Sequence, residues 1–259
     1  MMLTYVLRND LAKKRTFCAR PHMPYRARIN NADIIGAHRR LTPYTYTTIT
    51  PEEHPEDYTP SAIYEIQRSR FLSYVIHVED ETTARTWVQS IRKKHFDARH
   101  VPYAWVLGAS AHLQRSSDDG EPGGTAGSPI LETIKTHGIT DAAVAVVRYF
   151  GGIKLGAGGL VRAYAHAAHI GIEAAKKVCM TLLHTMYVHI DYDLLALLEH
   201  YVRDTNLCMG ETVYAEDVMF TLFIPTGDIE IHQQGITNIT SGRAVFALGD
   251  RNYIAAPMS

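Results

Sequence analysis

Two glycine-rich segments hold the residues of this chain that are best suited to bind a charged group. The first, SSDDGEPGGTAGSPIL at 116–131, combines three carboxylates with four glycines. The second, GGIKLGAGG at 151–159, separates a strongly apolar run from an alanine-rich run. Glycine lets backbone N–H groups approach a ligand, and a helix N-terminus favours an anion. The same glycines also suit tight turns and close helix packing, and both interpretations stay open at this stage.

The second segment departs from the common nucleotide-binding patterns. Gly156 and Gly158 suit a dinucleotide-binding turn, but Val161 stands where the third glycine belongs. Gly151 and Gly156 have the glycine spacing of a phosphate-binding loop, but no Lys-Ser or Lys-Thr pair follows them, and Lys154 lies inside the loop instead. The residues therefore indicate a general anion site or a packing device, and name no particular nucleotide.

The three carboxylates of the first segment, Asp118, Asp119 and Glu121, offer oxygen ligands for a divalent cation. Aspartate beside glycine is also the ordinary composition of a turn, and the alternating ligands of an EF-hand are missing. A turn or helix cap is therefore the preferred interpretation. Neither a metal site nor a cofactor is predicted.

Arg148 stands in a run of otherwise apolar residues, DAAVAVVRYF at 141–150. A buried arginine needs a carboxylate or an anion beside it, because burial of an unpaired charge is costly. We expect an internal ion pair with Asp118 or Asp119, and a ligand contact is the alternative.

A second group of polar residues, His95, Arg99 and His100, lies near the expected end of a helix and is a candidate for titration near neutral pH. The chain has 14 histidines, so most of them are incidental. No Ser-His-Asp spacing, nucleophile elbow or HExxH motif occurs. The sequence therefore does not support acyl transfer or zinc proteolysis, and it does not decide whether any reaction is catalysed.

The elements that must position these residues follow from apolar periodicity and capping signals. In the first part of the structured chain, the expected elements are a strand or hairpin at 61–78, a helix at 81–96 capped by Asp80, a strand at 103–109, a helix starting near Pro129 and capped by Thr125 or Ser128, a strand at 141–150 covered on both faces, and a helix at 160–178.

A second set of elements is expected from residue 179 onward. They are a strand at 180–190, a helix at 191–205 capped by Asp191, strands at 206–215 and 217–225, a helix at 228–240 weakened by Gly235, and a strand at 242–250. This β-α-β-β-α-β order is that of a ferredoxin-like domain. We therefore predict an α+β chain with domains at 58–178 and 179–259.

Composition and charge limit the functional classes. The chain of 259 residues is 46% hydrophobic and 20% charged, as in soluble globular proteins, and contains no apolar run long enough for a membrane span. Its three cysteines lie far apart, which favours the cytoplasm. The formal net charge is −1, and residues 186–259 are strongly acidic, so nucleic acid could meet only the earlier, more basic part. Residues 1–57 show no sustained apolar period and are expected to be an extended or disordered extension.

Read together, the motifs resemble those of the IMPACT family, which includes the YigZ-like bacterial proteins. The matching stretches are RSRF at 68–71, DARH at 97–100, SDDGEPGGTAGSPIL at 117–131 and VVRYFGGIKLGAGGLVRAY at 146–164. The resemblance extends over about residues 58–255. Two departures are that His100 is followed by Val101 and Pro102 in place of the usual His-Cys, and that residues 1–57 have no counterpart.

The resemblance implies a first domain similar to the second domain of a small-subunit ribosomal protein. It implies a ferredoxin-like second domain similar to the fifth domain of elongation factor G. Eukaryotic members of the family regulate translation initiation by binding the activator of an amino-acid-starvation kinase, whereas bacterial members have no firmly assigned reaction. Family membership alone does not give a mechanism.

Two functional hypotheses remain open. One is a cytoplasmic, translation-linked regulatory protein that holds RNA phosphate or a protein partner between the two glycine-rich segments. The other is an enzyme that binds a small-molecule phosphate or nucleotide, since LGAGGL at 155–160 faintly resembles the loop of GHMP kinases. The sequence gives no indication of oligomeric state. The candidate ligand-binding residues are Arg99, His100, Asp118, Asp119, Glu121, Thr125, Ser128, Arg148, Gly151, Gly152, Lys154, Gly156, Gly158, Gly159 and Arg162.

Overall fold

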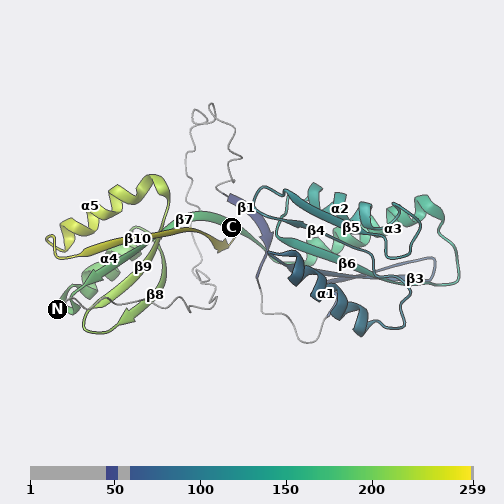
Figure 1. Ribbon diagram of the computed structural model, residues 1–259, viewed down its shortest axis with the longest axis horizontal. Helices are drawn as coiled ribbons and strands as arrows, with labels where there is room; N and C mark the ends of the chain where they lie inside the picture. Colours follow the sequence, from purple (N-terminus) through teal and green to yellow (C-terminus); the bar gives the residue numbers. More distant parts are fainter. Residues whose placement is uncertain (1–44, 52–58, 258–259) are drawn as a thin grey trace, which may run out of the picture. The chain divides into compact units, whose positions relative to one another are not determined.

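The computed structural model describes residues 45–51 and 59–257, which fall into two compact units (Figure 1). We call the described part up to Leu182 the first unit and the part from Leu183 to Ala255 the second unit. Each unit combines strands with helices, so the predicted α+β class with two domains is confirmed. No helix among the described residues is both long and apolar enough to cross a membrane.

The first unit is built on a five-stranded sheet in which neighbouring strands are antiparallel. The apolar run around Val144 forms the middle strand, and every residue of that strand except Tyr149 is buried. This confirms the expected strand covered on both faces. In sheet order the strands are β2 (Ala62–Ile66), β3 (Ser69–His77), β6 (Ala142–Tyr149), β4 (Tyr103–Leu107) and β5 (Leu113–Ser117).

Three helices cover this sheet in two layers: α1 (Glu81–Lys94) on one face, α2 (Gly127–Thr136) and α3 (Gly156–Ala174) on the other (Figure 1). Successive side chains of a strand point to opposite faces. Val144 and Val146 therefore pack with α2 and α3, whereas Ala143 and Ala145 pack with α1.

Helix α1 begins as its capping residue predicts. The Asp80 carboxylate accepts a hydrogen bond from the Thr83 backbone N–H at 2.8 Å, which satisfies one of the free donors of the first turn. Its apolar side chains, including Trp87 and Ile91, are buried against the sheet. Basic residues in its last turn oppose the negative end of the helix dipole.

Two strands lie where the sequence gives no strand pattern. Strand β1 (Thr45–Ile49) pairs antiparallel with the start of β7 (Lys177–Ile190). Its Thr/Tyr-rich sequence shows no sustained apolar period, and the pairing depends on a segment far away in the chain. Edge strand β5 exposes Leu113 and Arg115, so it lacks the buried alternate residues by which strands are recognised.

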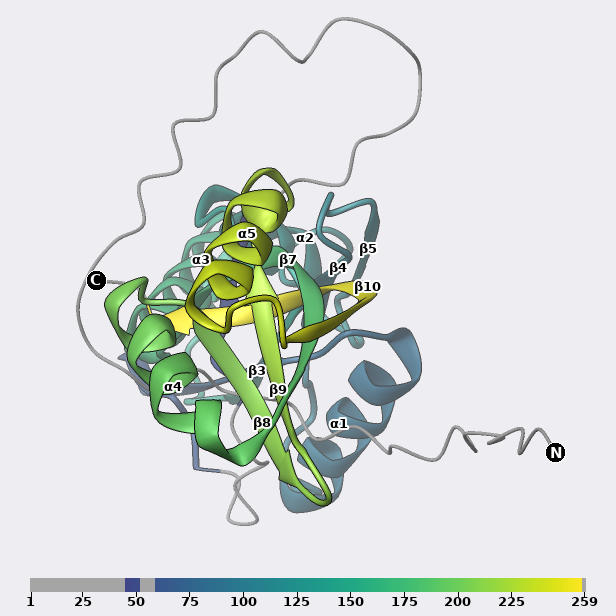
Figure 2. The ribbon, with the colours of Figure 1, turned by 90° about the vertical axis from the view of Figure 1, so that its left-hand side faces the viewer.

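The second unit places two helices on a sheet whose strand order is β8-β9-β7-β10. Strand β9 pairs antiparallel with both β7 and β8. One apolar cluster joins β7 and β9 to both helices, which lie on the same face of the strands (Figure 2). After β7, the elements are α4 (Leu195–Asp204), β8 (Cys208–Tyr214), β9 (Val218–Ile224), α5 (Ile229–Ile239) and β10 (Val245–Pro257), with a short 3-10 turn before each helix.

One sequence-based expectation for this unit is wrong, and another gains a reason from packing. Asp191 does not cap α4, because the turn Tyr192–Leu194 intervenes and the Asp191 side chain makes no cap hydrogen bond; its carboxylate lies 3.6 Å from Arg243 instead. Gly235 has a packing reason, since a Cβ there would collide with the Tyr201 hydroxyl of α4. The glycine therefore allows the two helices to approach.

Candidate functional site

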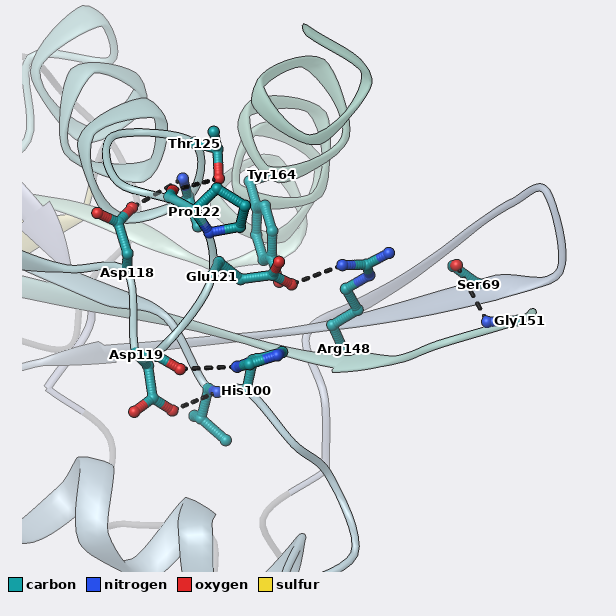
Figure 3. Close-up of polar contacts among 12 residues, drawn as sticks. Ser69, His100, Asp118, Asp119, Glu121, Pro122, Thr125, Arg148, Gly151 and Tyr164 are labelled. Atoms are coloured by element: carbon teal, nitrogen blue, oxygen red, sulfur yellow. Dashed lines mark hydrogen bonds and ion pairs between the residues drawn. The ribbon is translucent and has the colours of Figure 1, made fainter. Parts of the chain in front are cut away.

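Both glycine-rich segments leave the same edge of the first unit's sheet. Strands β5 and β6 each pair antiparallel with β4, so they run in the same direction and end at the same edge. The first segment then leads from β5 into α2, and the second leads from β6 into α3. The topology therefore brings the two helix N-termini and the preceding loops to one edge (Figure 3).

Asp118 is the residue that caps α2. One carboxylate oxygen accepts hydrogen bonds from the backbone N–H groups of Ala126 and Gly127 at 2.9 and 2.8 Å, and the other accepts from Gly124 at 2.8 Å. Burial by itself raises the pKa of Asp118, but these three backbone donors outweigh it, so the pKa is lowered. The preferred sequence-based interpretation, a turn or a cap, fits this carboxylate.

Thr125 and Ser128, which the sequence predicts as caps of α2, do not cap it. The helix begins at Gly127 rather than near Pro129, and its first backbone donors are taken by Asp118. Thr125 donates its hydroxyl to the Pro122 carbonyl at 2.7 Å within the loop, and Ser128 is exposed in the first turn. The predicted cap by Thr125 or Ser128 is therefore wrong, because a carboxylate from the preceding loop reaches the helix end.

Asp119 fastens the same loop to its surroundings. Its carboxylate accepts a hydrogen bond from the Val101 backbone N–H at 2.6 Å and forms an ion pair with Arg92 of α1. Its carbonyl oxygen accepts a hydrogen bond from the His100 ring at 2.8 Å. Asp119 therefore joins the loop to α1 and to the segment before β4, which is a structural role.

Glu121, and not Asp118 or Asp119, is the partner of Arg148. The Arg148 guanidinium donates to Glu121 at 2.7 Å, and the Tyr164 hydroxyl donates to the same oxygen at 2.7 Å (Figure 3). The Arg148 and Glu121 side chains are 9% and 3% exposed. Burial, and then the hydrogen bond to Glu121, raises the pKa of Tyr164, so its hydroxyl stays protonated as a donor. The expected internal ion pair exists, but with a different carboxylate.

Arg148 keeps unused donor capacity. Its guanidinium lies 5.7 Å from the Phe71 ring and 5.5 Å from the Phe150 ring, which shield it from water. Its buried Nε has no hydrogen-bond partner among the described residues. A guanidinium has five N–H donors. Because Glu121 accepts from it through one carboxylate oxygen, Arg148 can still donate hydrogen bonds to a second anionic group.

The fold explains why three positions of the second segment are glycine. A Cβ on Gly151 would collide with the backbone of Arg68 in the β2–β3 turn, and the Gly151 N–H donates to the Ser69 hydroxyl at 3.2 Å (Figure 3). Gly152 and Gly156 have φ values of +86° and +69°, a region that side chains other than glycine disfavour. These positions serve the turn that leads into α3.

Gly158 has no such reason. It lies in the first turn of α3 with an ordinary backbone, and a Cβ there would meet only the tip of Arg162, 3.7 Å away. Glycine in a helix costs about 1 kcal/mol relative to alanine. Gly159 is intermediate, because a Cβ would come within 3.0 Å of Leu155. The absence of a side chain at Gly158 is therefore unexplained by packing.

The start of α3 is the electropositive part of the site. Its N-cap residue, Leu155, supplies no side-chain hydrogen bond, and its first turn holds no acidic residue. Lys154 and Arg162 are exposed beside it. Free backbone N–H groups and the helix dipole favour an anion at such an end.

The remaining candidates lie around the same loops, and the histidines have separate partners. Arg99 is exposed and His100 is half-buried. His95 is buried and makes contacts of 2.6 and 2.7 Å with the hydroxyl groups of Tyr74 and Tyr149. Burial, followed by the charge of the neighbouring lysine, lowers the pKa of His95. The proposed grouping of His95 with His100 therefore does not describe one hydrogen-bonded set.

Two residues of this site, Arg92 and Tyr164, are absent from the candidates chosen by sequence. Tyr164 falls within the stretch VVRYFGGIKLGAGGLVRAY and on the buried face of α3, so its hydroxyl among apolar neighbours was a usable signal. Arg92 is one of several basic residues at the end of α1, and nothing in the sequence distinguishes it from Lys93.

Models of two protein families match the chain. The model described as the Impact N-terminal domain matches residues 67–172, and one described as a domain of unknown function, DUF1949, matches residues 188–243. The first match contains both glycine-rich segments and every candidate residue named above. The second match lies within the second unit.

Curated proteins are similar to the chain over most of their own lengths. IMPACT family member YvyE of Bacillus subtilis is 36% identical over 189 residues, which cover 73% of this chain and 87% of the relative. IMPACT family member YigZ of Escherichia coli is 35% identical over 184 residues, which cover 70% and 90%. A solved structure described as a hypothetical protein aligns with a TM-score of 0.52 and 28% identity, covering 80% of this chain and 98% of the other.

Proposed function

Because the chain belongs to the IMPACT family, we propose that it is a translation-linked regulatory protein whose first unit holds an anionic group of its partner. RNA phosphate is the favoured group, and an acidic protein partner is the other form of the same hypothesis. The anion is held where α3 begins, with Arg148 and Arg162 supplying charge. The protein works in the cytoplasm.

The observation that carries this proposal is the exposed, uncapped start of α3 around Gly158. A cation beside a helix N-terminus is electrostatically unfavourable. Arg162 nevertheless reaches back toward Gly158 in the first turn. An anion bound between the backbone N–H groups and Arg162 would remove that conflict and would also explain the missing side chain at Gly158.

The proposal includes a description of both domains. We take 58–178 as an IMPACT-type domain similar to a ribosomal-protein domain, and 179–259 as a ferredoxin-like domain, with 1–57 as an extension that contributes strand β1. The second description is supported by the strand order β8-β9-β7-β10 and by the alternation of elements from β7 to β10. That combination is typical of ferredoxin-like sheets.

Co-sedimentation with ribosomes over a graded salt series tests the proposal. The logarithm of the binding constant falls linearly with the logarithm of the salt concentration, with a slope of about −0.7 to −0.9 for each phosphate contact. We expect binding at low salt that falls steeply with ionic strength. Absence of binding at the lowest salt would rule out the nucleic-acid form and leave the acidic protein partner.

An enzyme that binds a small phosphate or nucleotide is the second candidate, since the same helix start would suit a nucleotide phosphate. A ligand that binds only the native state raises its apparent stability. A thermal-denaturation series with ATP and Mg²⁺ at millimolar concentration therefore separates the two. A raised midpoint that Arg162→Ala abolishes supports the enzyme, and an unchanged midpoint argues against it.

A further inference from the structure

Two histidines and a glutamate meet at the far ends of the helices that begin at the candidate site. His137 is the residue at which α2 ends, and His169 and Glu173 lie in the last turns of α3. One ligand atom from each lies within 4.8 Å of the others. Glu173 follows Gly158 by fifteen positions on α3, which is about 22 Å along the helix, so the cluster is separate from the candidate anion site.

The closest approaches in the cluster match those of metal ligands. Nε2 of His137 lies 3.1 Å from Nδ1 of His169 and 3.2 Å from Oε1 of Glu173. Zinc bonds of about 2.0–2.1 Å in tetrahedral geometry place neighbouring ligand atoms about 3.3–3.4 Å apart. One ion could therefore contact these atoms with only small side-chain shifts.

The hydrogen bond on the other side of His137 fixes which ring atom faces the cluster. Its Nδ1 lies 2.8 Å from the Thr133 carbonyl oxygen, and a carbonyl only accepts, so Nδ1 carries a proton. In the neutral ring, Nε2 then presents a lone pair toward the other two side chains. Metal-binding histidines are commonly oriented in this way, by donating their second ring N–H to a backbone carbonyl.

A cation would stabilise the cluster. The His137 lone pair and the Glu173 carboxylate are both acceptors, and they face each other at 3.2 Å. The ends of α2 and α3 add the negative pole of two helix dipoles. Lys177 supplies part of the balancing charge, because its ammonium lies 3.6 Å from Glu173. A proton on His137 would bridge two of the three groups, whereas a metal ion would bridge all three.

We propose that His137, His169 and Glu173 form a binding site for a divalent transition-metal ion of the zinc class. Imidazole and carboxylate ligands suit zinc and its neighbours better than calcium or magnesium. Three protein ligands leave one tetrahedral position open for water or an exogenous ligand. The bound ion joins the end of α2 to the end of α3. His166, three residues before His169, packs on the Tyr64 ring with centroids 4.5 Å apart and stays outside the set.

Isothermal titration of the chelator-treated full chain with Zn²⁺ tests the site. We expect His169→Gln and Glu173→Gln each to weaken one binding event by at least about tenfold, the lower end of what loss of even an indirect partner of a metal costs. The matched control is His200→Gln. His200 forms an exposed pair with Asp204 on α4 at 2.8 Å, without a third ligand, and its replacement should leave the affinity unchanged.

Two further measurements make the result decisive. Both site variants lie on exposed helix positions, so their unfolding midpoints without metal should match that of the parent chain. Co²⁺ in place of Zn²⁺ should give the visible absorption of a four-coordinate ion in the parent and in His200→Gln, and lose it in the two site variants. Absence of saturable Zn²⁺ binding, or equal affinity in all four proteins, would overturn the proposal and leave a protonated His137–Glu173 pair.

Discussion

The two glycine-rich segments look alike in their glycine content but differ in how their polar groups are used. In the first, Asp118, Asp119 and Glu121 each have internal partners: the α2 start, the Val101 N–H and the Arg148–Tyr164 pair. In the second, the start of α3 keeps backbone donors without a side-chain cap. The segment richer in charge therefore uses its carboxylates within the fold, and the segment poorer in charge is the one that we propose as the binding segment.

This difference shows why charged residues are a poor guide to a binding surface by themselves. Buried charged groups are normally paired, because the cost of leaving one unpaired is several kcal/mol. The useful question is which donors and acceptors lack a partner after folding. At this edge of the sheet the answer is the start of α3 and the Nε of Arg148.

Among these changes, loss of the Glu121 carboxylate should lower the free energy of unfolding most. Glu121→Ala leaves Arg148 buried with one partner fewer, and we expect the free energy of unfolding of the first unit to fall by about 3–5 kcal/mol. Urea denaturation followed by tryptophan fluorescence measures it, since both tryptophans, Trp87 and Trp105, lie in the first unit.

A paired replacement is the control for that experiment. Glu121→Leu combined with Arg148→Met removes both charges together, and should cost less than Glu121→Ala alone, because no unpaired charge remains. A fall below about 1 kcal/mol in Glu121→Ala, within the range of an ordinary exposed ion pair, would contradict the structural role of the first segment.

Two glycines of the second segment should respond in opposite ways. Gly151→Ala forces a methyl group against the Arg68 backbone, and we expect a loss of about 1–3 kcal/mol. Gly158→Ala makes only an ordinary contact with the tip of Arg162 and replaces a glycine in the first turn of α3, so it should raise stability by up to about 1 kcal/mol. Urea denaturation of the two variants and the parent chain measures these changes in the free energy of unfolding. Equal destabilisation by both would mean that Gly158 also serves the fold.

The Asp118 cap should give a smaller, pH-dependent effect. Asp118→Ala removes the acceptor for the α2 start, and we expect a loss of about 0.5–2 kcal/mol at pH 7. The folded-state pKa of Asp118 is lowered, so its contribution is present above the unfolded value of about 3.9 and is lost as pH falls through the folded pKa.

Thermal unfolding of Asp118→Ala and the parent chain between pH 7 and pH 2 should therefore converge at the acid end. Ser128→Ala is the matched control. This serine is the cap that the sequence favours, but it is exposed, so its loss should change stability by less than about 0.5 kcal/mol. A larger effect for Ser128→Ala than for Asp118→Ala would reverse the assignment of the cap.

Local signals in the sequence predict most of the elements of the fold. Asp80 before an amphipathic run predicts α1, and a continuous apolar run predicts the central strand around Val144. Strand β1 could not be predicted, because its pairing partner lies more than a hundred residues away, at Lys177 and beyond. The edge strand β5 lacks a buried face, so it carries no periodic signal.

The candidate site was predictable as a region but not in its pairings. Both glycine-rich segments carry recognisable motifs, and topology brings them to one edge. Which of three neighbouring carboxylates meets Arg148 depends on the path of a short loop, in which Asp119 has a φ of +49°. A shift of one residue in that loop would put Asp119 in the place of Asp118 and would move Glu121 away from Arg148, and propensities do not resolve such a shift.

We propose that the start of α3 binds phosphate of RNA. The most direct test is to measure the salt dependence of ribosome binding by Arg162→Ala. The exposed Arg203 of the second unit provides the matched control, Arg203→Ala. We predict that Arg162→Ala weakens binding and reduces the log–log salt slope by about 1, the value for one lost phosphate contact, while Arg203→Ala leaves both unchanged. Equal affinities and equal salt slopes for the parent chain and both variants would contradict phosphate binding at the start of α3.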